Sequence, residues 1–302
     1  MLVIGMELEL FNSRITINAD YYKNRSSNQL VGYPLPPTTG FNTIQSNFPA
    51  TVENTGLELS VSSMNIQSKP FTWSTVFNIS IPKNKLIAFP DLELSPAYAD
   101  KLVVGQPLDI LKLYHYTGVD PDTGVHTVLD VNDDGVINDD DKQTIKRLGR
   151  EYYGGLMNSL NYKGFQLNIL FQFVKQTGTK LSLGTPGFMT NQPVSVLDRW
   201  QSPGDVTDTQ LFVRNSSRTY GYYTSSDAFI TDASFIRLKN VSISYTLPKV
   251  LLERIHLADA KIFINGQNLL SLTKYEGLDP EFPSISYLPS LRVISAGFNV
   301  TF

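Results

Sequence analysis

Residues 165–173 read Phe165-Gln166-Leu167-Asn168-Ile169-Leu170-Phe171-Gln172-Phe173, and this stretch decides the fold. Large apolar side chains alternate here with polar ones, and a period of two places the two kinds on opposite faces of a β-strand. The polar face carries Gln and Asn and no charged residue, whereas a soluble sheet usually puts Lys and Glu on its wet face. An apolar face toward lipid and an uncharged polar face toward a water-filled lumen fit this pattern better.

The same alternation recurs along the chain. Phe71, Trp73, Thr75, Phe77 and Ile79 share one predicted face, and so do Ile294, Ala296, Phe298, Val300 and Phe302. Many of the segments exceed the ~5–6 residues usual for strands and reach the roughly 9–11 that a tilted membrane strand needs. Nine strands are predicted, at about 2–11, 14–25, 52–64, 71–82, 151–162, 165–176, 233–247, 260–272 and 291–302.

The connections alternate between short and long. Residues 12–13, 65–70 and 162–164 form tight turns, whereas 26–51, 83–150 and 177–232 are long loops and 273–290 is intermediate. Outer-membrane barrels have short periplasmic turns and long extracellular loops, which is the same asymmetry. Residues 248–259 are then a longer periplasmic connection, in which Leu251, Leu252 and Ile255 form one helical turn.

The number of strands adds a constraint on the architecture. In an antiparallel meander of nine strands the first and the last run in the same direction, so they cannot close an all-antiparallel barrel, and an open edge does not survive in lipid. We therefore expect an all-β, antiparallel transmembrane β-barrel segment with long extracellular loops, within a larger barrel.

Composition excludes several classes of protein. The 302 residues are 41% hydrophobic and 18% charged, too apolar for a disordered chain. The net charge of −3 offers no basic field, so no nucleic-acid partner is expected. Cysteine is absent, which removes disulfides, thiolate nucleophiles and cysteine-zinc sites. No apolar run reaches the ~18 residues of a transmembrane helix, and no signal peptide is readable.

One segment, residues 130–141, carries a metal-binding pattern: Asp-Val-Asn-Asp-Asp-Gly-Val-Ile-Asn-Asp-Asp-Asp. It matches a calcium loop of the EF-hand type, with oxygen ligands at positions 1, 3 and 5, Gly135 at position 6, a carbonyl at 7 and a carboxylate at 12. Asp stands where the usual loop has Glu at position 12, and helices do not flank both sides. The predicted Ca²⁺ ligands are Asp130, Asn132, Asp134, the Val136 carbonyl, Asn138 through water, and Asp141; the alternative is an acidic surface loop without metal.

Other chemistry is sparse. His115, His126 and His256 have no partners at zinc-ligand spacing and are expected at the surface or at an interface. The acidic group Glu276, Asp279 and Glu281 is expected to be a solvated loop. Tyr220, Tyr222, Tyr223 and Phe229 are expected to pack a loop or an interfacial girdle, with stacking on a flat ligand as the alternative. No catalytic motif is present, so we do not expect an enzyme.

Several stretches together resemble the SusC/RagA-like TonB-dependent outer-membrane transporters. Ser226–Tyr245, with its Phe229–Val241 core, is similar to the family's most distinctive motif. The other matching stretches are Asn18–Tyr22, Pro34-Leu35-Pro36, Asn54–Leu59, Gly118–Gly124 with the acidic loop 130–141, Asn265–Leu270, Gly277–Glu281 and the terminal Phe302.

The resemblance implies import of large nutrients, glycan oligomers or peptides, across the outer membrane of a Gram-negative bacterium of the Bacteroidetes type. It implies a SusD-like surface lipoprotein and the TonB–ExbB–ExbD motor as partners, besides outer-membrane lipid and the ligand. Residues 1–302 would then supply about the last nine strands of a barrel of 22, with the TonB box, the plug and the early strands outside them. The alternative function is a secreted, calcium-stabilised β-sandwich that binds carbohydrate.

Overall fold

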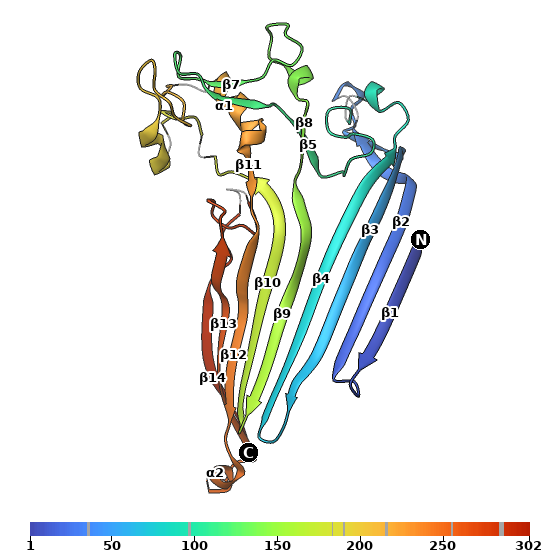
Figure 1. Cartoon of the computed structure of the whole chain (residues 1–302), viewed down its shortest axis with the longest axis vertical. Helices are drawn as coiled ribbons and strands as arrows, with labels where there is room; N and C mark the ends of the chain where they lie inside the picture. The colour runs from blue at the N-terminus through green and yellow to red at the C-terminus, as the bar shows by residue number, and fades with distance from the viewer. Residues whose placement is uncertain are drawn as a thin grey trace.

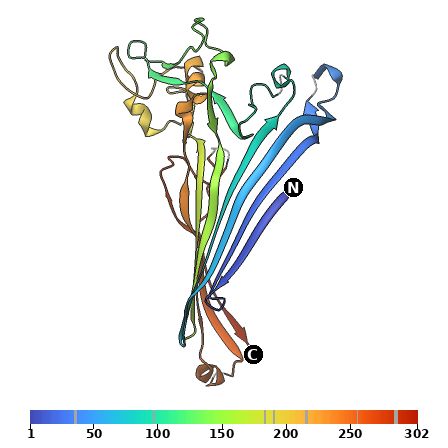
Figure 2. The ribbon, with the colours of Figure 1, turned by 45° about the vertical axis from the view of Figure 1, so that its right-hand side comes forward.

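Nine long antiparallel strands form one curved sheet in the computed structural model (Figures 1 and 2). The structure describes residues 1–34, 37–95, 98–182, 184–189, 191–214, 217–254, 256–283 and 287–302. The order across the sheet is the order along the chain, and all nine predicted strands are confirmed. The strands are β1 (Leu2–Leu10), β2 (Ile15–Pro34), β3 (Thr43–Gln67), β4 (Phe71–Ala88), β9 (Gly149–Tyr162), β10 (Phe165–Thr179), β12 (Phe235–Thr246), β13 (Asp259–Thr273) and β14 (Val293–Thr301).

The sheet is open. In the described residues β1 pairs only with β2, and β14 pairs only with β13, so both outer strands leave one edge free. A free edge in lipid exposes unpaired N–H and C=O groups at a cost of several kcal/mol each. The described strands therefore form a section of a barrel wall, as the strand count predicts.

Register places the apolar residues of neighbouring strands in rows on one face. Directly paired residues share a face, and near the tight turns one row is almost entirely aromatic. This aromatic row consists of Phe71, Tyr162, Phe165, Tyr245, Ile262 and Phe298. The row beside it, farther from the turns, is wholly apolar and consists of Trp73, Leu160, Leu167, Ile243, Ile264 and Ala296.

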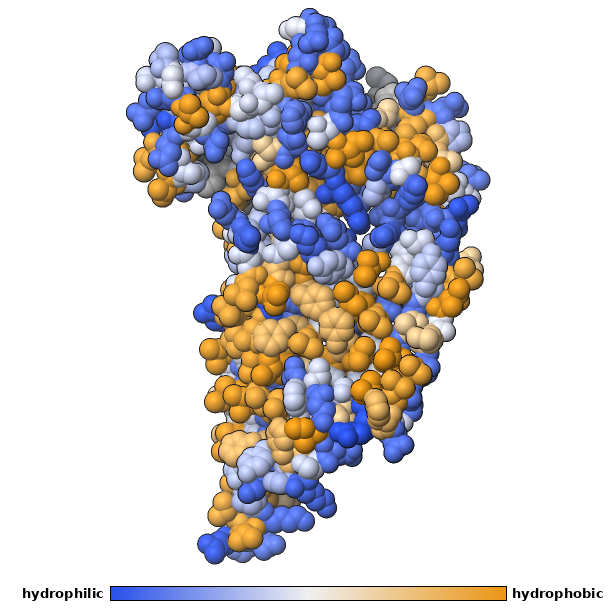
Figure 3. Space-filling model, viewed as in Figure 1, coloured by the Kyte–Doolittle hydropathy of each residue, from blue (hydrophilic) through white to orange (hydrophobic). Residues whose placement is uncertain are grey.

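This apolar face is exposed over a broad band (Figure 3). Ile264 is 51% exposed and Phe298 76% exposed, and no second sheet covers them among the described residues. A soluble sandwich would bury such a face against another layer. The β-sandwich alternative is therefore wrong, while the aromatic row matches the interfacial girdle of a membrane barrel.

A glycine in the centre of the sheet makes room for an aromatic stack. The rings of Phe77 and Phe173 stack at 5.7 Å between centroids with planes 10° apart. They belong to β4 and β10, which lie on either side of β9. A Cβ added to Gly154 on β9 would lie 2.5 Å from the Phe173 ring and 2.1 Å from the Asn78 carbonyl oxygen. Gly154 thus lets two non-adjacent strands contact each other across a third.

One loop prediction is wrong. Residues 26–51 are mostly strand, because β2 continues to Pro34 and β3 starts at Thr43. Beyond the apolar band most described side chains of this hairpin are exposed, although Phe48 and Ala50 pack into a small cluster, so the ladder continues without a regular apolar alternation. Of the predicted Pro34-Leu35-Pro36 motif, Leu35 and Pro36 lie outside the described residues.

The long loops gather at one end of the sheet and carry small elements of their own (Figure 1). Two two-stranded sheets form there, and an isolated bridge ties Tyr114 to Ser226. A small buried cluster of Ala50, Leu86 and Phe89 lies beside the top of β3 and β4. The elements are β5 (Ile110–Leu113) with β8 (Thr144–Arg147), β6 (Tyr116–Val119) with β7 (His126–Val128), α1 (Arg218–Thr224), β11 (Ile230–Asp232, on β10) and short 3-10 turns at Pro37–Thr39, Leu92–Leu94, Asp139–Asp141, Val194–Asp198 and Asp227–Phe229.

The opposite end has tight turns and α2 (Lys249–Arg254), which lies near the C-terminus in Figure 1. This confirms the predicted helical turn at Leu251 and Leu252; Ile255 lies outside the described residues. No helix in the described part of the chain is long and apolar enough to cross a membrane.

Candidate functional site

The face opposite the apolar band is lined with small uncharged polar side chains. One row crosses six neighbouring strands and contains only serine and asparagine. Such groups donate and accept hydrogen bonds without imposing a charge, which suits a water-filled lumen. The row consists of Ser74, Ser159, Asn168, Ser242, Asn265 and Ser295.

Arg237 is a buried charged residue on this face, which also carries the charged Asp20 and Glu58 on β2 and β3. It lies in the row of Asn78, Gly155 and Gln172, toward the end of the sheet with the long loops. The alternation of β12 explains its position, because Ile236 and Leu238 on either side point to the apolar face. Only 3% of the Arg237 side chain is exposed, so its charge requires partners inside the protein.

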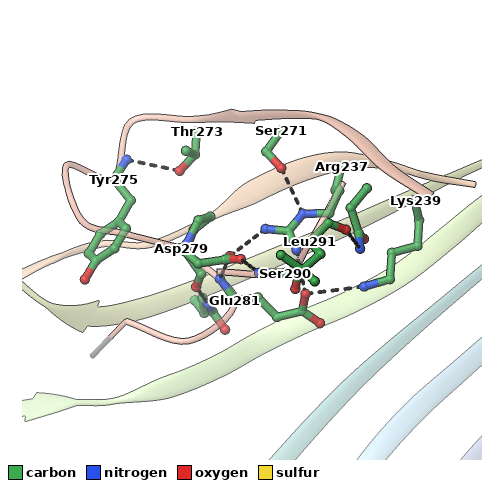
Figure 4. Close-up of polar contacts among 12 residues, drawn as sticks. Arg237, Lys239, Ser271, Thr273, Tyr275, Asp279, Glu281, Ser290 and Leu291 are labelled. Atoms are coloured by element: carbon green, nitrogen blue, oxygen red, sulfur yellow. Dashed lines mark hydrogen bonds and ion pairs between the residues drawn. The ribbon is translucent and has the colours of Figure 1, made fainter. Parts of the chain in front are cut away.

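Those partners come from the last long loop (Figure 4). Arg237 donates from Nη2 to Asp279 Oδ1 at 2.5 Å, from Nη1 to Glu281 Oε2 at 2.7 Å and from Nε to Ser271 Oγ at 2.8 Å. Lys239 adds a longer contact of 3.4 Å to the same Glu281 oxygen. Two carboxylates and one hydroxyl therefore satisfy the guanidinium, which is how a buried charge is tolerated.

Asp279 is also held by the backbone of its own loop. Its Oδ1 accepts the Glu281 N–H at 2.9 Å and its Oδ2 accepts the Ser290 N–H at 3.0 Å. Burial raises the pKa of Asp279, but these two N–H groups and Arg237 outweigh it and lower the pKa below the ordinary 3.8. The carboxylate stays ionised and fixes both ends of the loop around it.

Further contacts anchor this loop to the sheet. The Gln176 side chain donates to the Pro280 carbonyl, the Tyr275 hydroxyl donates to the Thr179 carbonyl at 3.0 Å, and Asn268 donates to the Leu291 carbonyl at 2.9 Å. We call residues 274–292 the tethered loop. A cavity of about 480 Å³ beside it is lined by Ser271, Tyr275, Ser290 and the exposed Arg292 among other residues.

The tethered loop corrects one prediction. Asp279 was expected in a solvated loop, but it is only 4% exposed because it neutralises Arg237. The sequence places Arg237 and Asp279 in two of the stretches that carry the family resemblance, 229–241 and 277–281. Their pairing links residues 42 apart, and no local periodicity reveals it.

A second cluster packs the loops above the sheet. His126 is 2% exposed and stacks on Tyr223 at 4.5 Å, while its Nδ1 lies 2.9 Å from the Tyr116 hydroxyl. The prediction of a surface or interface position is therefore wrong for His126, which is buried inside the packed loops. Burial lowers its pKa from 6.5 to about 4, only partly countered by Asp208, so the ring is neutral. Tyr220 and Phe229 contact the Tyr223 ring, and Tyr222 contacts the Tyr114 ring, in agreement with the packing role.

The predicted calcium loop has an ordered hydrogen-bond frame. Gly135, at φ +77°, donates its N–H to Asp130 Oδ2 at 2.8 Å, and Val136 donates its N–H to Asp134 Oδ1 at 2.7 Å. Asn132 accepts the Asp134 N–H, and Asn138 accepts the Asp140 N–H. The other oxygen of Asp130 is buried and has no hydrogen-bond partner.

Asp141 closes this frame. Its two oxygens accept the N–H groups of Val131 at 2.8 Å and Asn138 at 2.9 Å, and these bonds lower the pKa of the fully buried carboxyl. Within the described residues, no three His, Asp or Glu side chains come together closely enough to hold a metal ion. The loop thus has the donor chemistry for Ca²⁺, while Asp141 is directed at backbone N–H groups.

Comparisons with known proteins agree with this geometry. The family model described as TonB dependent receptor-like, beta-barrel, matches residues 4–269. TonB-dependent receptor P3 of Formosa agariphila is 30% identical over 92% of the chain, and TonB-dependent receptor SusC of Bacteroides thetaiotaomicron is 25% identical over 93%. The matches cover 30% and 29% of these relatives, so the chain spans about a third of their length.

A solved structure shows the same fold. The RagAB peptide transporter superposes on 99% of the chain with a TM-score of 0.79 at 22% identity, and the match covers 35% of that chain. The chain therefore belongs to the TonB-dependent receptor-like β-barrel family, and it forms part of a barrel wall in the outer membrane of a Gram-negative bacterium.

Proposed function

We propose that residues 1–302 are the C-terminal wall of a SusC/RagA-like importer that moves large nutrients, glycan oligomers or peptides, across the outer membrane. The observation that carries the proposal is the uncharged serine and asparagine row beneath the tethered loop. Hydroxyl- and amide-rich ligands form hydrogen bonds with such a surface without the desolvation cost of a charge. The solved structure with the same fold is named a peptide transporter, which supports cargo of this class.

The test is growth on defined nutrients. A strain that lacks the gene should fail to grow on one class of oligosaccharide or peptide as sole source and should grow normally on the corresponding monomers. Complementation with the wild-type gene should restore growth. Unchanged growth on every oligomer that the parent strain uses would contradict the proposal.

The proposed partners follow from the same family. A SusD-like lipoprotein would cover the extracellular end, where α1 and the two small sheets lie, and the TonB–ExbB–ExbD motor would act through a plug outside residues 1–302. Affinity purification of the tagged transporter should recover one surface lipoprotein in equal amount, and loss of TonB should abolish uptake. We expect the importer to have no enzymatic activity, as the family of receptors indicates.

We further propose that loop 130–141 binds Ca²⁺. The unpartnered, buried Asp130 oxygen and the sharp turn at Gly135 support this. Asp130, Asn132, Asp134, the Val136 carbonyl, Asn138 and Asp141 would supply the oxygen ligands, since a carboxylate oxygen that accepts one N–H keeps further acceptor capacity. Chelator should lower the protease resistance of residues 83–150, and Asp134→Ala should do the same; unchanged cleavage in both cases would contradict the site.

A further inference from the structure

The lipid-facing side of β2, β3 and β4 changes abruptly from apolar to basic. One row on this face consists of Tyr21, Leu57 and Ile81. The next row toward the long loops begins the change with Lys23 and Lys83, and the row after it holds Arg25, Glu53 and Lys85. Because same-face residues are two apart along a strand, only about 7 Å separates each row from the next.

We propose that Lys23, Arg25, Lys83 and Lys85 form a binding site for the phosphate groups of the outer-leaflet glycolipid. We call these four residues the basic rim. They lie at the end of the sheet with the long loops, which in outer-membrane barrels is the extracellular end. The lipid of that leaflet is a phosphorylated glycolipid, whose phosphates lie just above its acyl chains. The basic rim and the apolar row below it match this order.

The charges of the basic rim are only partly neutralised by the described residues of the protein. Glu53 is the carboxylate that pairs here, with Lys23 at 3.1 Å and Arg25 at 2.7 Å, so four cations face one anion. Lys83 and Lys85 are exposed, and neither has an ion pair or hydrogen bond among the described residues. Phosphate oxygens are strong acceptors for lysine and arginine donors.

A cavity gives the phosphate a place. It has a volume of about 310 Å³ and is lined by Glu53, Thr55, Lys83, Lys85 and Arg147 together with Gly105 and Pro107. The Arg147 charge is compensated by Asp109 at 3.1 Å. Lys83 and Lys85 are thus the free cations of this cavity within the described residues.

The same transition occurs elsewhere on this face. On β10 the apolar Phe173 is followed by Lys175, and at the end of β13 Leu272 is followed by Lys274. Lys175 and Lys274 each lie two residues beyond an apolar residue, as Lys23 and Lys83 do, and Lys175 is paired with Asp232 at 2.8 Å. The basic rim is therefore the densest part of a boundary that follows the outer leaflet, and its long side chains can reach the headgroup level.

The test compares lipids that differ only in phosphate. The whole transporter, purified from outer membranes in detergent, is titrated with bisphosphorylated lipid A and with its dephosphorylated form, and bound lipid is counted by native mass spectrometry. Lys83→Gln/Lys85→Gln should bind the phosphorylated lipid roughly 30-fold more weakly, because each cation near an anionic lipid surface changes affinity about fivefold. Lys83→Arg/Lys85→Arg should bind as the wild type does.

The matched control removes the same charge at the periplasmic end. Lys163→Gln/Lys249→Gln changes exposed lysines in the β9–β10 turn and in α2, and should leave affinity unchanged. The heat-dependent shift in gel mobility checks that each variant forms an assembled barrel. If Lys83→Gln/Lys85→Gln does not assemble, Arg25→Gln replaces it and should weaken binding of the phosphorylated lipid about fivefold. Equal affinity for both lipids, full affinity in the Gln variants, or equally tight binding of inorganic phosphate would overturn the proposal.

Discussion

Replacing Arg237 with methionine should release the tethered loop. The substitution keeps the aliphatic volume but removes the charge that faces Asp279 and Glu281, and Asp279 is only 4% exposed. Breaking a buried pair by removal of one partner costs about 3–5 kcal/mol, because the remaining charge is left uncompensated. At about 1.4 kcal/mol per factor of ten, the equilibrium constant for local opening should rise about 100- to 4,000-fold.

Hydrogen exchange measures this opening directly. The N–H groups of Glu281 and Ser290 donate to Asp279, so their protection reports whether the loop is closed. In Arg237→Met both amides should lose protection by the factor above, while amides in the middle of β10 should not change. Lys239→Met is the control, because its 3.4 Å contact to Glu281 is partly exposed and such pairs contribute at most about 1 kcal/mol.

Acid should act on the same contact. The pKa of Asp279 lies below 3.8 in the folded protein, so the carboxylate stabilises the closed loop fully above about pH 4. This stabilisation is lost as the pH falls through the lowered pKa of the folded state. Protection of the two amides in the wild type should therefore persist at pH 5. If Arg237→Met exchanged within threefold of the wild type, the ion pair would not be what holds the loop.

Three further predictions concern other parts of the molecule. The loops above the sheet should lose up to about 3 kcal/mol of stability as the pH falls from 6.5 to 4, because His126 binds a proton in the unfolded state but stays neutral when buried in the folded state. Limited proteolysis at different pH values measures this loss, and the His126→Phe variant should not show it. Free calcium at 100 times its dissociation constant should stabilise loop 130–141 by about 2.7 kcal/mol, measured as protease resistance, and Asp130→Ala should abolish the response. Gly154→Ala should lower the urea midpoint of the assembled barrel by the equivalent of about 1–3 kcal/mol, because the added Cβ would overlap the Asn78 carbonyl oxygen. Gly155→Ala is the control and should be tolerated, since the nearest atom to its added Cβ is 3.5 Å away. Equal urea midpoints for the two variants would refute the packing argument.

The membrane part of the fold could be predicted from the sequence because lipid imposes a period of two. Where a lipid-facing residue has polar neighbours on both sides, as Leu167 has in Gln166 and Asn168, the alternation is visible in the sequence alone. The prediction failed at 26–51, where the β2–β3 hairpin leaves the apolar band and most of its described side chains are exposed. The strand continues there because backbone hydrogen bonding does not depend on side-chain contrast.

The candidate site was predicted only in part. The polar face follows from the same alternation, so Asn168 and Gln172 were placed correctly. The pairing of Arg237 with Asp279 could not be predicted, because it depends on how a loop folds back onto the sheet. The same holds for His126, whose burial depends on Tyr223 nearly 100 residues away. The calcium loop remains a prediction.

The strict neighbour-to-neighbour order of the nine strands has a consequence for how such proteins diversify. Each inner strand is paired with the long strand before it and the one after it, and the connections at one end are short, so the register is set without the long loops. Insertions between β4 and β9 or between β10 and β12 can therefore lengthen, shorten or be exchanged between paralogues while the wall stays in place. Evolution can then change the cargo by altering what lies above the wall, at little risk to assembly in the membrane.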